Sequence, residues 1–299
     1  MKKTVFAFIL IASLFSCGKE AKIKTADKTD PGTLTKNTAS TLTAKSTNPT
    51  AKALEEIIFK TDSVKQHIHS KNALALYLKF REETEQLVSR IAEDNAYLLD
   101  NYYTHFSEKT NALILPDSLQ LKLKGFKKAN IEFQEIGEGY VEVRPVANYY
   151  VNIFNGKLPT DYNDYIRLEA FENKELIAAD AGLVISFKEL SVLVLHWETF
   201  LQKHPHSVLF KQVKEKYKGL LGMYLFGLDN TPTMEANGDN VMEVYEENQK
   251  EFERFTVQNP KSVTSKLVLA LLEGIKSHLE PNDLNKKIEQ EFLKYTITQ

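Results

Sequence analysis

Carboxylates and tyrosines gather between residues 138 and 180, and these two side-chain types can perform several kinds of chemistry. The members are Glu138, Glu142, Tyr149, Tyr150, Asp161, Tyr162, Asp164, Tyr165, Glu169, Glu172 and Asp180. Two carboxyl groups that face one cleft could serve as general acid and general base in glycoside cleavage. Carboxylates also suit Ca²⁺, but the chain has no D-x-D-x-D-G loop. Carboxylates on amphipathic helices usually face water, so solvated surface is the first interpretation, a binding surface the second and catalysis the third.

Two H-x-H pairs are the other residues with metal-binding chemistry, namely His67/His69 and His204/His206. Positions i and i+2 of a helix point about 200° apart, so His67 and His69 cannot share a metal unless the helix breaks. The second pair flanks Pro205, and an internal repeat places Asn259 and Lys261 at the equivalent positions. Asn and Lys bind no metal together, so we predict a structural turn there and no metal site.

The common catalytic signatures are absent from the sequence. There is no G-x-S-x-G, no phosphate-binding glycine loop and no H-E-x-x-H, which are the strong signals for hydrolases and nucleotide enzymes. Cys17 is the only cysteine, and the formal net charge of −2 provides no field of one sign that would favour nucleic acid. These features favour a binding protein over an enzyme and predict no cofactor.

The elements that position these residues are predicted to be mainly helical. Residues 48–50 form a helix-start signal, and apolar residues then recur near helical spacing up to Tyr103, which predicts one or two long amphipathic helices. Residues 131–136 and 140–144 alternate between apolar and polar side chains around Gly137-Glu138-Gly139, which predicts a β-hairpin. We expect this hairpin to be the only sheet.

Two prolines after the hairpin are predicted to begin helices. Pro145 is expected to start a helix that Asn155-Gly156 ends. Pro159 is expected to start a second helix that runs to about Ala179. Residues 104–130 have a mixed pattern that includes Pro116, so the sequence does not decide which elements form there.

The clearest local signal lies just after this second helix. Ser186 and Glu189 match the S-x-x-E pattern of a capping box, and Ile185 and Leu190 occupy the flanking positions of a hydrophobic staple. In a capping box, each residue bonds the backbone of the other and so satisfies the free amides of a helix start. This pattern predicts a helix over residues 187–203.

An internal repeat of 55 residues (252 − 197) begins in that helix. Trp197-Glu198-Thr199-Phe200 leads to His204-Pro205-His206-Ser207-Val208, and Phe252-Glu253-Arg254-Phe255 leads to Asn259-Pro260-Lys261-Ser262-Val263. In each copy a helix is predicted to end at an aromatic-rich turn, a proline blocks its continuation, and Ser207 or Ser262 caps the next helix. Helix pairs with a fixed period are typical of stacked repeats, so we expect residues 187–226 and 240–280 to form two equivalent pairs.

The aromatic residue, the proline and the serine cap resemble the junctions of tetratricopeptide-like helical repeats over residues 187–280. The spacing of 55 residues differs from the family's period of about 34, and its small-residue packing positions are not evident. The resemblance therefore implies only the stacking of helix pairs, and no functional residue is transferred from it. The expected fold class is mainly α, with stacked helical hairpins and one small β-hairpin.

The N-terminal residues resemble the signal peptide of bacterial lipoproteins. Two lysines precede an apolar core over residues 5–12, which is shorter than the roughly 20 residues of a spanning helix. Leu14-Phe15-Ser16-Cys17 then has the order of a type II lipobox, although Phe15 is bulkier than the family usually allows. The resemblance implies cleavage before Cys17, with diacylglycerol on its sulfur and an acyl chain on its amino group. Gly18 after the cysteine, instead of aspartate, favours the outer membrane by the same resemblance, without deciding the leaflet.

These signals predict four parts of the chain. They are a signal peptide over 1–16, a lipid-anchored linker over 17–50, a helical region with the hairpin near 131–144 over 51–185, and a tandem helical-hairpin region over 186–299. The linker is rich in threonine and lysine and has no aromatic residue. It cannot bury enough apolar surface to offset the entropy of ordering it, so we expect a flexible tether.

The sequence predicts an outer-membrane lipoprotein that binds a protein or glycan partner without turnover. One alternative is an envelope hydrolase that uses the Asp and Glu residues of the 138–180 run, and another is an accessory lipoprotein of an outer-membrane transporter. A hydrolase predicts a carboxyl with raised pKa in a deep pocket, whereas a binding module predicts an exposed aromatic patch.

A binding site is expected where the chain departs from the regular helical body. Tyrosine supplies large contact area at low entropic cost, so it is the side chain expected at such a site. The predicted binding residues are Tyr149, Tyr150, Tyr162, Tyr165, Glu138 and Arg144. Tyr149 and Tyr162 also have the spacing of core residues, so the exposed members of the set are expected to carry the binding.

Overall fold

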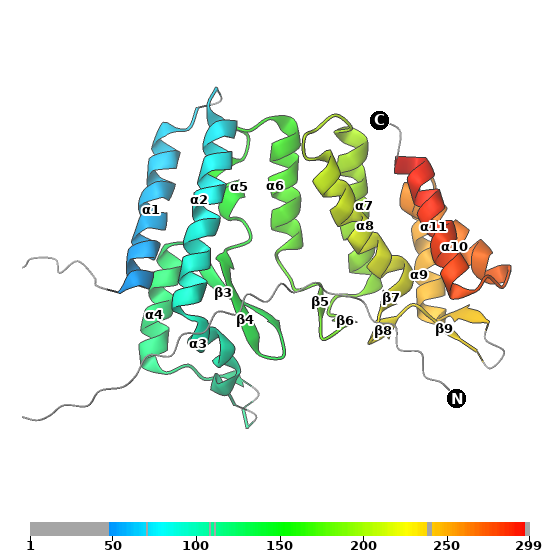
Figure 1. The fold of residues 1–299 in the computed structure, drawn as a ribbon, viewed down its shortest axis with the longest axis horizontal. Coiled ribbons are helices and arrows are strands. Elements are labelled where there is room, and N and C mark those ends of the chain that lie inside the picture. Colours follow the sequence, from blue (N-terminus) through cyan, green and yellow to red (C-terminus); the bar gives the residue numbers. More distant parts are fainter. Residues whose placement is uncertain (1–47, 70, 108, 111, 238–240, 297–299) are drawn as a thin grey trace, which may run out of the picture. The chain divides into compact units, whose positions relative to one another are not determined.

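Helices make up most of the structure, as the sequence predicts. The computed structural model describes residues 48–69, 71–107, 109–110, 112–237 and 241–296 (Figure 1). These residues form eleven α-helices, one 3₁₀-helix and five two-stranded antiparallel sheets. The predicted signal peptide, Cys17 and the linker up to residue 47 lie outside the described residues. None of the helices in these ranges is long and apolar enough to cross a bilayer.

The first pair of helices is α1 (Pro49–His67) and α2 (Ala73–Asp94), which lie side by side (Figure 1). The side chain of Asn48 accepts a hydrogen bond of 3.0 Å from the Thr50 amide, so the predicted start signal does cap α1. The long helical stretch of the sequence is therefore two helices. The short helix α3 (Ala96–Asp100) and the 3₁₀-helix η1 (Tyr102–His105) follow α2.

The predicted hairpin is formed by β3 (Ile131–Gly137) and β4 (Tyr140–Pro145). Its turn depends on glycine, because Gly139 has a φ of 76° and a Cβ atom there would lie 2.6 Å from the Cβ of Tyr103. Pro145 is the last residue of β4 and does not begin a helix. The prediction of a helix start at Pro145 is therefore wrong, because this residue pairs with Ile131 in the sheet.

The hairpin is not the only sheet, which corrects a second expectation. The other pairs are β1 (Phe106–Ser107) with β2 (Ala112–Leu113), β5 (Ala178–Ala179) with β6 (Gly182–Leu183), β7 (Gly227–Leu228) with β8 (Thr231–Pro232), and β9 (Met234–Ala236) with β10 (Met242–Val244). Strands of two or three residues are too short to produce the alternation by which a longer strand is detected. They close turns between helices.

Beyond α3 and η1, three more helices lie between the first pair and the repeat. They are α4 (Asp117–Lys128), α5 (Tyr149–Phe154) and α6 (Thr160–Glu172). The predicted helix end near Ala179 is wrong, because α6 stops at Glu172 and the chain then forms the β5–β6 pair. The Val184 amide donates to the Ile177 carbonyl at 2.9 Å, so this pairing satisfies backbone groups that a longer helix would have used.

Two helix pairs and a final helix complete the fold (Figure 1). The pairs are α7 (Phe187–Lys203) with α8 (Phe210–Phe226), and α9 (Glu246–Gln258) with α10 (Val263–Lys276), followed by α11 (Pro281–Thr296). The chain turns between helices at both Pro205 and Pro260, as the repeat predicts. One hydrophobic core continues from Ile57 of α1 to Ile288 of α11, so the described helices stack on one another.

The capping box at the start of α7 is confirmed. Ser186 Oγ accepts from the Glu189 amide at 3.2 Å, and the Glu189 carboxylate accepts from the Ser186 amide at 2.9 Å. In the second repeat, Ser262 Oγ accepts from the Ser265 amide at 2.9 Å and caps α10 as predicted. These contacts join residues three apart, which is why sequence patterns reveal them.

The predicted serine cap of α8 is wrong. The residue that precedes α8 is Leu209, and no side chain caps this helix. Ser207 Oγ donates to Asp161 of α6 at 2.6 Å and accepts from the Leu209 amide at 3.1 Å. A contact with a distant helix therefore replaces the cap in the first repeat.

Candidate functional site

Four carboxylates of α6 from the acidic run hold this helix in place. They are Asp161, bound by Ser207; Asp164, bound by Lys203 and His204; Glu169, bound by Arg81; and Glu172, bound by Trp197 and Lys216. The distances of these contacts lie between 2.6 and 2.8 Å. The carboxylates thereby connect α6 to α2, α7, α8 and the turn between the last two.

Asp164 shows the electrostatic effect of such a contact. Burial alone would raise its pKa, but hydrogen bonds from Lys203 and His204 outweigh burial and lower the pKa below its ordinary value of 3.8. A depressed pKa in the folded state means that the ionised carboxyl stabilises the fold above about pH 3.8. This contribution is lost as the pH falls through the folded-state pKa.

Asp164→Asn is therefore expected to lower the free energy of unfolding by about 0.5–1 kcal/mol at neutral pH, because the contact is partly exposed to solvent. Urea unfolding at pH 7 and at steps down to pH 3 measures the difference from the unchanged protein, which should shrink below pH 3.8. The exposed Asp100, with no partner among the described residues, provides Asp100→Asn as the control. A difference that stays constant across this pH range would contradict the prediction.

The four predicted binding tyrosines are not exposed. Tyr149, Tyr162 and Tyr165 are buried, and Tyr150 is partly buried, with an enclosed hydroxyl that has no hydrogen-bond partner among the described residues. T-shaped contacts of 5.9 Å between ring centroids join both Tyr150 and Tyr162 to Tyr77 of α2. The core assignment of Tyr149 and Tyr162 is confirmed. The expectation of exposed tyrosines in this set is wrong, because α2 packs against the residues of α5 and α6 that carry them.

Arg144 and Glu138, the other predicted binding residues, lie apart. Arg144 donates to the Glu132 carboxylate at 3.1 Å and, at 2.8 Å each, to the Gln134 side chain and the Asn173 carbonyl. Glu138 is exposed in the turn of the hairpin, with a φ of 53°. The six predicted residues therefore do not form one site.

Arg144 and Tyr150 do line a common groove of about 310 Å³ against α2, β4 and α6. Arg81 lines it too, and its guanidinium carbon lies 5.4 Å from the centre of the Tyr150 ring. Both arginines of the lining already pair with carboxylates, those of Glu169 and Glu132. The described lining thus has no uncommitted cation for an anionic ligand.

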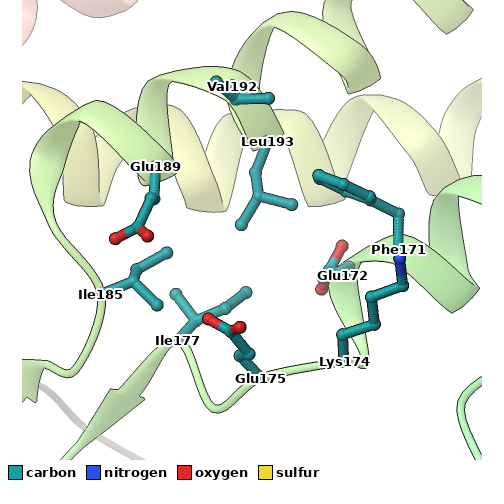
Figure 2. Close-up of a pocket in the computed structure, with 9 residues that line it drawn as sticks. All are labelled: Phe171, Glu172, Lys174, Glu175, Ile177, Ile185, Glu189, Val192 and Leu193. Carbon is teal, nitrogen blue, oxygen red and sulfur yellow. The ribbon is translucent and has the colours of Figure 1, made fainter.

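A second cavity, of about 250 Å³, lies between the end of α6 and the start of α7, and sequence reasoning missed it. We call it the α6–α7 pocket. Its lining residues are Phe171, Glu172, Lys174, Glu175, Ile177, Ile185, Glu189, Val192 and Leu193. Figure 2 shows Ile177, Ile185 and Leu193 pointing toward the same space, with Phe171 on one side and carboxylates at the edge.

The α6–α7 pocket exists because α6 ends early. Glu172 is the last residue of α6, and the chain between the two helices brings Ile177 and Ile185 to the cavity. The capping box fixes the first turn of α7, and Glu189, Val192 and Leu193 then share one face of the helix at i, i+3 and i+4 spacing. The staple position of Ile185 was the one sequence signal that pointed to this junction.

The carboxylates of the pocket differ in the hydrogen bonds and ion pairs that they form. Glu172 accepts from the Trp197 indole at 2.7 Å and pairs with Lys216 at 2.8 Å. Hydrogen bonds from Ser186 lower the pKa of Glu189, so this exposed carboxyl is ionised at neutral pH. Glu175 is exposed and has no partner among the described residues. The pocket is therefore apolar inside and acidic at its edge.

The one basic residue of the described lining, Lys174, directs its ammonium group toward an aromatic ring. The ammonium group of Lys174 lies 5.4 Å from the centre of the Phe171 ring, a distance at which a cation is attracted to a ring face. His196 packs against the same ring, with 4.9 Å between centroids, and burial lowers the pKa of His196. Phe171 is thus supported from two sides while 39% of it stays exposed.

The histidine pairs take structural positions. α1 ends at His67, so His67 and His69 do not share a helix. His204 is the C-cap residue directly after α7, and its Nε2 lies 2.8 Å from the Asp164 carboxylate. Within the described ranges, no three His, Cys, Asp or Glu side chains are grouped so that they could hold a metal ion.

Exposed aromatic side chains occur near the tip of the β3–β4 hairpin. Tyr103 and Tyr140 are about half exposed and contact each other with ring centroids 6.4 Å apart. Phe106 and Leu113 are exposed partners in the β1–β2 pair. Exposed apolar groups of this kind are expected of a binding module, although they differ from the tyrosines that the sequence suggested.

Comparison with known proteins adds no relative. No family model, no curated protein and no solved structure matches this chain.

Proposed function

We propose that this chain is a lipid-anchored protein of the cell envelope that binds a protein partner, without turnover, through the α6–α7 pocket. The observation that carries the binding role is the lining of this pocket, where apolar side chains reach the surface beside the carboxylates of Glu175 and Glu189. Surface clefts with an apolar lining and a few placed polar groups are typical of binding sites. The pocket residues replace the predicted tyrosines in this role.

The N-terminal sequence supports the envelope location. Leu14-Phe15-Ser16-Cys17 follows an apolar core of signal-peptide length, and two acyl chains or more anchor a protein stably. Gly18 supports the outer membrane as the destination. The threonine- and lysine-rich linker would let the folded part stand away from the lipid headgroups by a root-mean-square distance on the order of 30 Å.

The pocket suits a protein partner better than a glycan. A sugar brings hydroxyl groups that lose hydrogen bonds to water on binding and need protein groups to replace them. Most of the lining is apolar, and Glu172 and Glu189 already accept hydrogen bonds from Trp197 and Ser186. An apolar side chain of a protein would instead gain from leaving water.

The state of the carboxylates supports binding over hydrolysis. A carboxyl that acts as a general acid needs a raised pKa. Within the pocket, the pKa of Glu189 is lowered, and Glu172 is fixed by an indole and an ammonium group. Among the α6 carboxylates, Asp164 also has a lowered pKa.

Cys17→Ala tests the anchor. We expect the variant to leave the membrane fraction or to stall as the unprocessed precursor, because the anchor depends on acylation of this thiol. Fractionation of cells and the apparent mass of the chain on a gel measure the two outcomes. If the variant fractionates and matures like the unchanged protein, the lipoprotein assignment is wrong.

A photo-crosslinking residue placed at Val192 tests the pocket as the contact site in the intact envelope. Val192 is 40% exposed at the pocket, whereas Val257, 79% exposed on α9, provides a matched control on another helix. We expect one discrete adduct from position 192 that position 257 does not form. Adducts from both positions, or from neither, would contradict the proposed site.

A further inference from the structure

We infer that the α6–α7 pocket recognises an aromatic side chain that is flanked by arginine or lysine in a peptide segment of the partner. This inference rests on the proposed function, because it assigns a chemical class of partner to the same pocket. Three observations carry it: the volume of the cavity, the apolar character of its walls, and the sign and position of the charges at its edge.

The volume fits one ring with little room to spare. The cavity measures about 250 Å³, which is below the range of roughly 300–1,000 Å³ in which most small-molecule sites fall. An apolar cavity of roughly 150 Å³ already admits benzene. The α6–α7 pocket can therefore hold a phenyl or indole group together with the first carbon of its side chain.

The walls favour a ring as the occupant. Ile177, Ile185 and Leu193 provide aliphatic contacts, and Figure 2 shows the ring of Phe171 beside them. The aromatic ring of a ligand can meet Phe171 edge to face, an arrangement that is favourable beyond the burial of apolar area. Aromatic side chains are also the usual anchors of protein interfaces.

The charges at the edge select the neighbours of that ring. Glu175 and Glu189 are exposed on the chain segments that border the cavity, and neither pairs with a basic side chain among the described residues. The ammonium group of Lys174 is directed to the Phe171 ring. A partner with arginine or lysine beside the ring would meet two carboxylates, whereas a carboxylate or phosphate ligand would be repelled.

The chain carries a natural reporter for this pocket. Trp197 is the single tryptophan, and its indole nitrogen donates to the pocket residue Glu172 at 2.7 Å. A ligand that shifts Glu172 changes the hydrogen bond of the indole and hence the fluorescence of the protein. Peptides without tryptophan leave this signal free of background.

The test is a titration of the purified full chain in detergent micelles with three capped peptides. Their sequences are Gly-Arg-Phe-Arg-Gly, Gly-Arg-Ser-Arg-Gly and Gly-Asp-Phe-Asp-Gly. Calorimetry measures affinity, and Trp197 fluorescence reports whether the pocket is occupied. We expect the first peptide to bind with a dissociation constant on the order of 0.1–1 mM, as is reasonable for one anchored ring, and the other two to bind at least about tenfold more weakly.

Glu175→Lys separates recognition of charge from a general loss of structure. Glu175 is exposed and unpaired among the described residues, so the substitution leaves the fold intact. We expect the substitution to weaken binding of the Arg-Phe-Arg peptide by about 3- to 10-fold, because a weak ion pair becomes a repulsion. Binding of the Asp-Phe-Asp peptide should become stronger. Glu55→Lys on α1, also exposed and unpaired in the described structure, is the control and should change neither affinity.

The outcomes distinguish this inference from the proposed function. Equal binding of the Arg-Ser-Arg or the Asp-Phe-Asp peptide, or no saturable binding, would overturn the assigned chemistry even if position 192 still forms its adduct in the envelope. Loss of the Arg-Phe-Arg affinity in both charge variants would also overturn it, because the effect would not depend on the pocket. Preferential binding of that peptide without an adduct would instead refute the proposed function.

Discussion

Glu198→Ala is expected to lower the free energy of unfolding by about 3–5 kcal/mol, because it removes a buried acceptor and leaves several donors without a partner. Glu198 lies on α7 and is only 2% exposed. Its carboxylate accepts from the amides of Val263 and Thr264 at 2.7 and 2.9 Å, and from the Thr264 hydroxyl at 2.7 Å. It thus caps the start of α10 from the preceding helix pair.

Glu198→Gln should also be destabilising, by about 2 kcal/mol. One carboxylate oxygen faces the Val263 amide and the other faces the Thr264 amide. Whichever way a glutamine side chain turns, its NH₂ group meets one of these donors. The conservative change is therefore not silent, which a role in packing alone would not predict.

Glu253 provides the matched control, since it occupies the equivalent repeat position (198 + 55) and is exposed on α9. Glu253→Ala should change the free energy of unfolding by less than about 0.5 kcal/mol. Urea unfolding followed by circular dichroism measures all three variants. Similar losses for the Glu198 and Glu253 variants would show that the network does not contribute as described.

Arg81→Ala is expected to lower the free energy of unfolding by about 2–4 kcal/mol, since it leaves a partly buried carboxylate without its cation. The Arg81 guanidinium binds both oxygens of Glu169, at 2.7 and 3.0 Å, and donates to the Tyr77 hydroxyl at 2.8 Å. Glu169 also accepts from the Tyr165 hydroxyl at 2.7 Å. This network joins α2 to α6 and raises the pKa of Arg81 above its ordinary value, against the effect of burial.

Arg81→Lys should retain less than half of the stability that Arg81→Ala removes, because an ammonium group cannot make the bidentate contact with Glu169. Arg90→Ala is the control on the same helix, since Arg90 is exposed and has no partner among the described residues. Thermal and urea unfolding of the three variants provide the comparison. The double variant with Arg81→Ala and Glu169→Leu removes both charges of the pair. If this variant is less stable than either single variant, an unpaired buried charge is not the source of the lost stability.

The sequence determined the elements whose causes are local. The Ser186–Glu189 capping box, the cap at Ser262 and the glycine turn of the β3–β4 hairpin all join residues within a few positions of one another. Pro205 and Pro260 prevent helix continuation through their own rings. Such patterns also established the mainly α class and the two helix pairs, and the N-terminal pattern alone supports the predicted lipid anchor.

Only the tertiary structure decided which of two similar residues is buried or bonded to a distant partner. Glu198 and Glu253 share a residue type and a repeat position, yet only Glu198 meets the start of another helix. Ser207 and Ser262 likewise match, but Asp161 takes the hydroxyl of Ser207. Tyr150 is of a residue type that is common at binding sites, but Tyr77 of α2 packs against its ring. Each outcome depends on a partner that is far away in the chain.

The α6–α7 pocket belongs to this second group. Residues 173–179 have helical spacing, so their local preference does not indicate that α6 ends at Glu172. The contact of Arg144 with the Asn173 carbonyl and the β5–β6 pairing satisfy the backbone beyond that point. Local sequence specifies hydrogen bonds between near neighbours, whereas a cavity is the space left among side chains of several segments and is fixed only when those segments pack.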